Sequence, residues 1–248
     1  MLARVAAALV LTAGALSAQV VRGPFVPVGV LIDAASGPLP REAIDELRRL
    51  RFNVVARRDT GAVPAALRVD AIPPPGEKPD APLALSRPAG LEVVPVAGDA
   101  TGDRVRQDAW VAIGRGGRGV LFDSWTTLSR NPAALAAGAA FADVVTRNAA
   151  LFAPLEPSAR TVRVEPASAE VFARLVESAE AMVLVAANLS DSPRQITLAF
   201  SADIPEAIWQ NMEAGGAVNF VAGPEGPIYT RAFPPRDVIV LMIRKQYR

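Results

Sequence analysis

Four aspartates that follow predicted strands are the first candidates for chemistry in this sequence. Asp33, Asp59, Asp99 and Asp123 each come shortly after an apolar run, and Trp125 follows Asp123 closely. Because the carboxyl ends of parallel strands meet at one rim, these side chains would gather where ligands bind in barrels and open α/β sheets. A carboxylate accepts hydrogen bonds from hydroxyl groups, and an indole ring stacks on a sugar ring. The set therefore predicts contact with a neutral polar ligand.

Each candidate has both a functional and a structural interpretation. Asp123 and Trp125 are the predicted substrate-binding pair, and Asp123, Asp99 and Asp33 are the predicted catalytic carboxylates. The alternatives are that Asp123 caps a turn, that Trp125 packs between two domains, and that Asp33 and Asp99 cap the next helix or turn. The sequence leaves both interpretations open.

The chain has no histidine and no cysteine. Their absence excludes Ser-His-Asp triads, Cys-His pairs, imidazole or thiolate metal sites and disulfides. Acid–base chemistry would therefore fall to Asp, Glu, Lys or Tyr. We expect neither a cofactor nor a metal.

The charge balance bears on the partners. The chain has 26 Lys+Arg against 25 Asp+Glu, and 51% of its residues are hydrophobic. This hydrophobic content is enough to bury one or two cores. Because nucleic-acid binding needs a concentrated basic face, we do not expect a nucleic-acid partner.

The amino terminus has the pattern of a cleavable signal peptide over residues 1–18. A short positive segment precedes an apolar run and the small-residue sequence Ala15-Leu16-Ser17-Ala18. The alternative is a non-cleaved anchor, although the run is shorter than the ~20 residues that normally span a bilayer. We expect export to the periplasm or the extracellular space, and no membrane association after cleavage.

The segment after the signal predicts an α/β domain over residues 19–157. Strands are expected at 28–32, 52–56, 91–96 and 119–122, with helices opening at Pro40, over 103–113, and from Asn131-Pro132 to about Leu151. A long proline-rich loop covers 60–90, with one candidate strand at 66–72. This alternation of strands and helices is typical of βα units around a parallel sheet.

The remaining residues, 158–248, predict a small antiparallel β-sandwich domain. Strands are expected at 171–176, 182–187, 195–201, 217–221 and 237–243. A helix over 169–178 is the alternative for the first of them. Trp110 and Trp209 are expected to be core residues.

Two short motifs also have plainer alternatives. The glycine-rich run from Gly114 to Gly119 suggests a phosphate loop, but it precedes a strand, so a helix-to-strand turn is favoured. Asn188-Leu189-Ser190 matches a glycosylation acceptor or an ordinary turn.

Three segments resemble the glycoside hydrolases of the β-galactosidase-type TIM-barrel clan. The segment 27–56, with its run Arg51-Phe-Asn-Val-Val55, resembles a first βα unit of such barrels. The segment 106–125 is similar to their last helix-to-strand passage, which ends in an aromatic near the sugar. Residues 148–155, leading into strands and Ala187-Asn-Leu-Ser190, resemble the small C-terminal β-domain of these enzymes.

The resemblance implies an abridged or incomplete (β/α) barrel followed by the sandwich. A full barrel needs about 250 residues, and the segment before Leu155 holds about half of that, with the proline-rich loop where the missing strands would be. The family places two catalytic glutamates after its fourth and seventh strands. Here the strand at 91–96 leads to Ala97-Gly98-Asp99 instead, and neither glutamate has a counterpart.

Three functions therefore stay open. The first is a glycosidase that acts through rim carboxylates, and the second is a non-catalytic carbohydrate-binding or structural remnant of such an enzyme. The third is an interaction module, such as a homo-oligomer, in which a partner covers the incomplete sheet edge.

Overall fold

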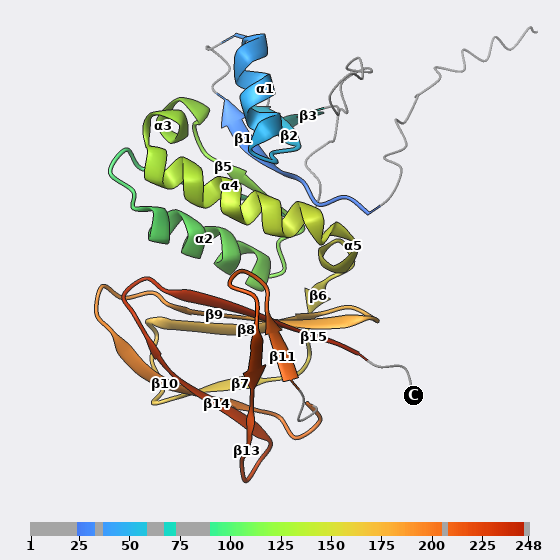
Figure 1. Cartoon of the computed structure of the whole chain (residues 1–248), viewed down its shortest axis with the longest axis vertical. Helices are drawn as coiled ribbons and strands as arrows, with labels where there is room; N and C mark the ends of the chain where they lie inside the picture. The colour runs from blue at the N-terminus through green and yellow to red at the C-terminus, as the bar shows by residue number, and fades with distance from the viewer. Residues whose placement is uncertain (1–23, 33–36, 59–66, 73–89, 205–207, 246–248) are drawn as a thin grey trace, which may run out of the picture.

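The computed structural model describes residues 24–32, 37–58, 67–72, 90–204 and 208–245. They form a mixed α/β fold with three sheets (Figure 1). The predicted signal peptide, Asp33, Asp59 and most of the predicted loop at 60–90 lie outside these ranges. Within them, no helix has both the length and the apolar character needed to cross a membrane.

The first sheet is open and has five strands. Strands β1, β2, β4 and β5 are parallel, whereas β3 is antiparallel to β2 and forms one edge, with β4 at the other. In spatial order the strands are β3 (Leu67–Ala71), β2 (Val54–Arg58), β1 (Val28–Ile32), β5 (Gly119–Phe122) and β4 (Leu91–Val94). The sheet does not close on itself.

Five helices accompany this sheet: α1 (Arg41–Arg49), α2 (Gly102–Gly114), α3 (Trp125–Arg130), α4 (Pro132–Arg147) and α5 (Ala149–Phe152). The predicted cap of α4 is confirmed, since the Asn131 side chain accepts the N–H of Ala134 at 3.1 Å and Pro132 follows it. The predicted single helix to Leu151 is wrong. The chain leaves the helical conformation at Asn148 (φ −110°), whose side-chain amide donates back to the Val144 carbonyl at 2.8 Å.

Both parallel crossovers, β1–α1–β2 and β4–α2–β5, step in the same direction across the sheet. Right-handed crossovers that step the same way place their helices on one face. Accordingly, Leu47 of α1, Trp110 of α2 and Phe141 of α4 belong to one core cluster with Val30 and Phe122 of the sheet. The carboxyl ends of β1, β2, β4 and β5 therefore point to a common rim.

After α5 the described residues form strands and turns and no helix. A six-stranded and a four-stranded sheet, ordered β12-β11-β15-β9-β8-β6 and β13-β14-β10-β7, enclose a second core cluster that includes Leu184, Leu198, Trp209 and Leu241. The strands are β6 (Glu156–Pro157), β7 (Val162–Glu165), β8 (Val171–Glu177), β9 (Ala181–Asn188), β10 (Arg194–Phe200), β11 (Ile208–Asn211), β12 (Ala217–Asn219), β13 (Val221–Ala222), β14 (Pro227–Phe233) and β15 (Val238–Arg244).

The predicted hairpin at 171–187 is confirmed, and the alternative helix over 169–178 is wrong. Strand β8 pairs with β9 along its whole length, and its last two residues also pair with β6, so its hydrogen bonds are those of a strand. Because β6 already pairs with β8, we call residues 24–155 the α/β unit and 156–245 the β unit. The predicted domain boundaries 19–157 and 158–248 stay predictions.

The two units are joined by the packing of α2 on the six-stranded sheet (Figure 1). The first core cluster continues across this contact into Val185 of β9 and Val240 of β15. Arg106 of α2 donates to both carboxylate oxygens of Glu213, at 2.9 and 2.7 Å, and to the Val238 carbonyl at 2.8 Å. The units therefore share one apolar core, and the Arg106–Glu213 ion pair lies at its border.

A second charge cluster, in the β unit, predicts a pH dependence of stability. Burial raises the pKa of Glu177, but hydrogen bonds from Lys245 and Ser158, both at 2.6 Å, and the charges of Lys245 and Arg160 outweigh it and hold the pKa below its ordinary 4.5. This stabilisation is present above pH 4.5 and is lost as the pH falls through the folded-state pKa. Glu177→Gln should lower the free energy of unfolding by about 1 kcal/mol at pH 7.

The difference should disappear in acid, as measured by urea denaturation across pH 2–7. Glu180→Gln changes an exposed residue of the same β8–β9 turn and should leave stability unchanged at every pH. An equal loss for Glu177→Gln at all pH values would contradict the assignment.

Candidate functional site

A cleft of about 560 Å³ lies between the two units. One wall is the loop between β4 and α2 with the first turns of α2, and the other wall comes from two turns of the β unit. The polar residues that line it are Asp99, Thr101, Asp103, Arg104, Asp108, Asp191 and Arg236. We call it the interdomain cleft.

The α/β wall is held in place by hydrogen bonds at both ends. Thr101 caps α2 by accepting the N–H of Arg104 at 3.2 Å. The side-chain amide of Asn131, at the start of α4, donates to the Ala100 carbonyl at 2.8 Å. The loop that carries Asp99 is therefore fixed between two helix starts, with the exposed Asp99 side chain on the cleft wall.

The β wall depends on one arginine. Arg236 donates to both carboxylate oxygens of Asp191, at 2.7 and 3.0 Å, and also to the Leu189 carbonyl. These hydrogen bonds hold the pKa of Asp191 below its ordinary value. Arg236 adopts a positive φ of 57°, an uncommon conformation outside glycine, which turns the chain sharply at this point. These hydrogen bonds therefore hold the Arg236 guanidinium in one orientation.

Asp108 lies on the second turn of α2, in the α/β wall, and interacts electrostatically with Arg236 of the β wall. Burial raises the pKa of its carboxyl, although the charges of Arg104 and Arg236 partly oppose the shift. Its nearest cation is Arg104, with Nε 3.6 Å from the carboxylate. A partly desolvated carboxyl in a cleft gains from a hydroxyl donor that replaces lost water.

The other predicted site residues lie elsewhere. Asp123 directly follows β5, where its N–H donates to the Val94 carbonyl at 2.8 Å, and its half-buried side chain is not part of the cleft. Trp125 starts α3 with 9% of its surface exposed and belongs to the first core cluster. Such burial leaves no open ring face for stacking on a sugar. Since α3 contacts α4 and β1, Trp125 packs within the α/β unit and not between two domains, as the alternative had it. Asp33 lies outside the described residues.

The two predicted catalytic carboxylates that the structure describes, Asp99 and Asp123, do not both line this cleft. Asp99 faces the interdomain cleft, and Asp123 does not. Glycoside hydrolysis needs two carboxyls facing each other across the scissile bond, about 5 to 9.5 Å apart. In the part of the chain that the structure describes, no group of three or more acidic side chains is arranged to hold a metal ion.

The remaining motifs have structural roles. The glycine-rich run ends α2 and turns into β5, with Gly116 at φ 93°, so the turn interpretation is confirmed. The glycosylation interpretation of Asn188 is wrong, because its buried amide donates to the Ser192 and Pro234 carbonyls at 2.7 and 2.9 Å. Trp110 and Trp209 are fully buried, which confirms them as core residues.

Sequence reasoning missed Asp108, Asp191 and Arg236. Asp108 has helical neighbours and looks like a solvated helix face, while the other two lie in proline-containing turns of the β unit. The only local signals are Asp191 before Ser192-Pro193 and Arg236 after Pro234-Pro235, both of which are typical of ordinary turns. Their convergence depends on how the two units pack.

Comparisons with known proteins give remote similarities only. No protein-family model matches the chain, and no curated protein matches it. Among solved structures, a noncanonic maltogenic α-amylase from Thermotoga neapolitana is 14% identical with a TM-score of 0.43, covering 64% of this chain and 43% of that one. An α-amylase from Geobacillus thermoleovorans in complex with acarbose is 7% identical with a TM-score of 0.42, covering 59% and 34%.

A GH30 endoxylanase from Clostridium papyrosolvens is 10% identical with a TM-score of 0.40, covering 62% of this chain and 42% of that one. This chain thus spans less than half of each of these three enzymes. At such TM-scores the similarities determine neither the fold nor the function of this chain.

Proposed function

We propose that this chain is an exported protein that binds a neutral saccharide in the interdomain cleft without hydrolysing it. The observation that carries the proposal is the cleft itself: a hollow of about 560 Å³ that is lined by carboxylates and guanidinium groups, with the Arg236–Asp191 pair held by two hydrogen bonds. Export rests on the signal-peptide pattern of residues 1–18.

The lining chemistry suits hydroxyl groups. The volume falls in the range of about 300–1,000 Å³ typical of small-molecule sites. Asp99 and Asp108 offer acceptors, while Arg236 offers donors that neighbouring groups already orient. A sugar hydroxyl both donates and accepts, so adjacent carboxylate and guanidinium groups can satisfy it at once.

Binding is favoured over hydrolysis because two carboxylates of the cleft are already paired with arginines. Asp191 is held by Arg236 and Asp108 lies beside Arg104, which leaves them as hydrogen-bond acceptors rather than as a facing acid and nucleophile. The cleft thus resembles a recognition site more than a hydrolytic one.

We also propose that the five-stranded sheet is an incomplete barrel and that the two antiparallel sheets form a sandwich. Two features support the barrel: both crossovers place their helices on one face, and the first strand, β1, pairs with the last parallel strand, β5. A doubly wound sheet would instead have helices on both faces. In a barrel, the first and last strands are neighbours.

Asp108→Asn should weaken saccharide binding about tenfold, because it replaces a charged acceptor with a neutral amide of the same shape. Binding is measured by thermal shift and calorimetry of the full chain against a panel of neutral mono- and disaccharides. Asp45→Asn is the matched control: Asp45 is also a helical aspartate beside a helical arginine, but it lies on α1, away from the cleft. It should bind like the parent.

The same panel should include chromogenic glycosides, with Asp99→Asn and Asp123→Asn alongside. We expect no turnover from any of the proteins. Turnover that either substitution abolishes would establish a hydrolase and overturn the binding proposal. An absence of binding to every sugar in the panel would also overturn it.

A further inference from the structure

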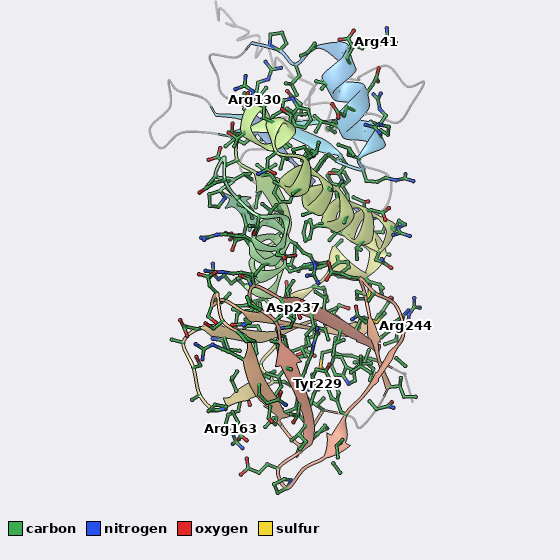
Figure 2. The ribbon with its side chains drawn as sticks, turned by 60° about the vertical axis from the view of Figure 1, so that its left-hand side comes forward. Arg41, Arg130, Arg163, Tyr229, Asp237 and Arg244 are labelled. Atoms are coloured by element: carbon green, nitrogen blue, oxygen red, sulfur yellow. The ribbon has the colours of Figure 1, made fainter. Side chains whose placement is uncertain are left out.

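A second hollow, separate from the interdomain cleft, lies where the carboxyl end of α4 meets the β11–β12 hairpin. It measures about 470 Å³, and its polar lining includes Arg147, Asn148, Gln210, Asn211, Glu213 and Arg244. Figure 2 shows Arg244 at the side of the molecule, near the level where the helices meet the sheets. We call this hollow the amide groove.

Among the described residues that line the amide groove, Glu213 is the one carboxylate, and it is already neutralised. Glu213 accepts three hydrogen bonds from Arg106, at 2.9, 3.1 and 2.7 Å, and a fourth from Trp110 Nε1 at 2.8 Å. Its side chain is only 16% exposed. Glu213 therefore presents little negative charge to a ligand in the groove.

Several donors of the amide groove are unused within the described residues. The Asn211 Oδ1 atom accepts the N–H groups of Glu213 and Ala214, both at 3.0 Å, which leaves the amide N–H₂ of Asn211 free. Gln210 and Arg244 are exposed and make no side-chain hydrogen bond or ion pair with any residue in the described ranges. The groove therefore has an excess of donors over acceptors.

Strand register brings these donors together. Gln210 of β11 pairs with Met242 of β15, so Gln210, Met242 and Arg244 project from the same face of the sheet. Met242 is buried in the first core cluster and is also part of the groove lining. The groove thus begins where the core between the two units ends, with an apolar floor and polar walls.

We infer that the amide groove binds a small ligand that carries an oxyanion, either a carboxylate or a phosphate, with Arg244 as its charged partner. A guanidinium presents a planar fork that matches two oxygens of either group. The amides of Gln210 and Asn211 supply neutral donors beside it. This site takes ligands of a different charge from the interdomain cleft and does not depend on the function proposed there.

The test titrates the full chain with inorganic phosphate, glucuronate and glucose at constant ionic strength, followed by calorimetry and by NMR of the side-chain amides. We expect phosphate or glucuronate to bind and to shift the amide resonances of Gln210 and Asn211, whereas glucose should not. Binding of glucuronate alone would show that the site prefers a ligand with a carboxylate, and binding of phosphate alone would show that it prefers a ligand with a phosphate.

Arg244→Gln should weaken that binding about tenfold, and Arg244→Lys should weaken it less, since it keeps the charge but loses the fork. Arg174→Gln is the matched control, an exposed arginine on β8 of the same unit, and should have no effect. The inference fails if neither anion binds, if the two amides do not shift, or if Arg174→Gln weakens binding as much as Arg244→Gln. The NMR readout uses the parent chain, so it stays decisive if a variant misfolds.

Discussion

Trp110→Ala is expected to lower the free energy of unfolding by about 3–5 kcal/mol, the range for truncating a large aromatic in a core. Trp110 is fully buried on α2, with its ring centroid 4.8 Å from that of Phe141 and 5.8 Å from that of Phe152. Its Nε1 donates to Glu213 at 2.8 Å. The substitution therefore opens a cavity among three helices and removes a hydrogen bond between the two units.

Urea denaturation of parent and variant measures this effect. Trp110→Phe separates the two contributions, because it keeps most of the packing but loses the donor to Glu213. It should cost clearly less than Trp110→Ala. A loss below about 1 kcal/mol for Trp110→Ala would show that α2 is not the centre of the contact between the units.

Gly29→Ala should destabilise the chain by at least about 3 kcal/mol, at or beyond the upper end for overpacking. Gly29 lies in the middle of β1, paired with Val54 of β2. A Cβ atom there would lie 1.8 Å from the Val54 carbonyl oxygen and 2.6 Å from its Cγ2 atom. The Val54 carbonyl belongs to the backbone and cannot move aside as a flexible side chain can. Strands β1 and β2 would therefore have to separate.

Gly138→Ala is the matched control, because Gly138 is a buried glycine on α4 with room for a methyl group. An added Cβ would make ordinary contacts at 3.5 Å with the rings of Phe122 and Phe52. Alanine is the better helix former by up to about 1 kcal/mol. We therefore expect Gly138→Ala to be neutral or stabilising in the same denaturation series, and equal losses for both variants would contradict the packing described.

Local patterns predicted most of the elements that form the sheet and its helices. The apolar run at 28–32 forms β1 with the expected bounds, and Asn131-Pro132 caps α4 as expected. These signals are short-range: side-chain alternation, capping oxygens and proline positions. Strands β7, β11 and β14 were missed, because each is short or carries several polar residues and also pairs with a strand that is distant in sequence, β10 for β7 and β14 and β15 for β11.

The candidate site was much less predictable than the fold. Asp99 was found because it follows a strand, but Arg236 is separated from it by most of the chain. The two meet because α2 packs on the six-stranded sheet, where Gln107 and Arg106 also donate to the carbonyls of Asn188 and Val238, at 2.6 and 2.8 Å. Figure 2 shows Asp237, the residue next to Arg236, at the same boundary between helices and sheet. Packing of two units is a tertiary property that no local pattern encodes.

The central claim is that a neutral saccharide occupies the interdomain cleft, and hydrogen–deuterium exchange of the full chain tests it most directly. Exchange would be compared with and without the sugar that gives the largest thermal shift. The account predicts protection of the loop at 95–104 and of the turns at 189–192 and 234–237, with no change at 208–216 in the amide groove. Protection confined to other segments, or no protection at saturating sugar, would contradict it.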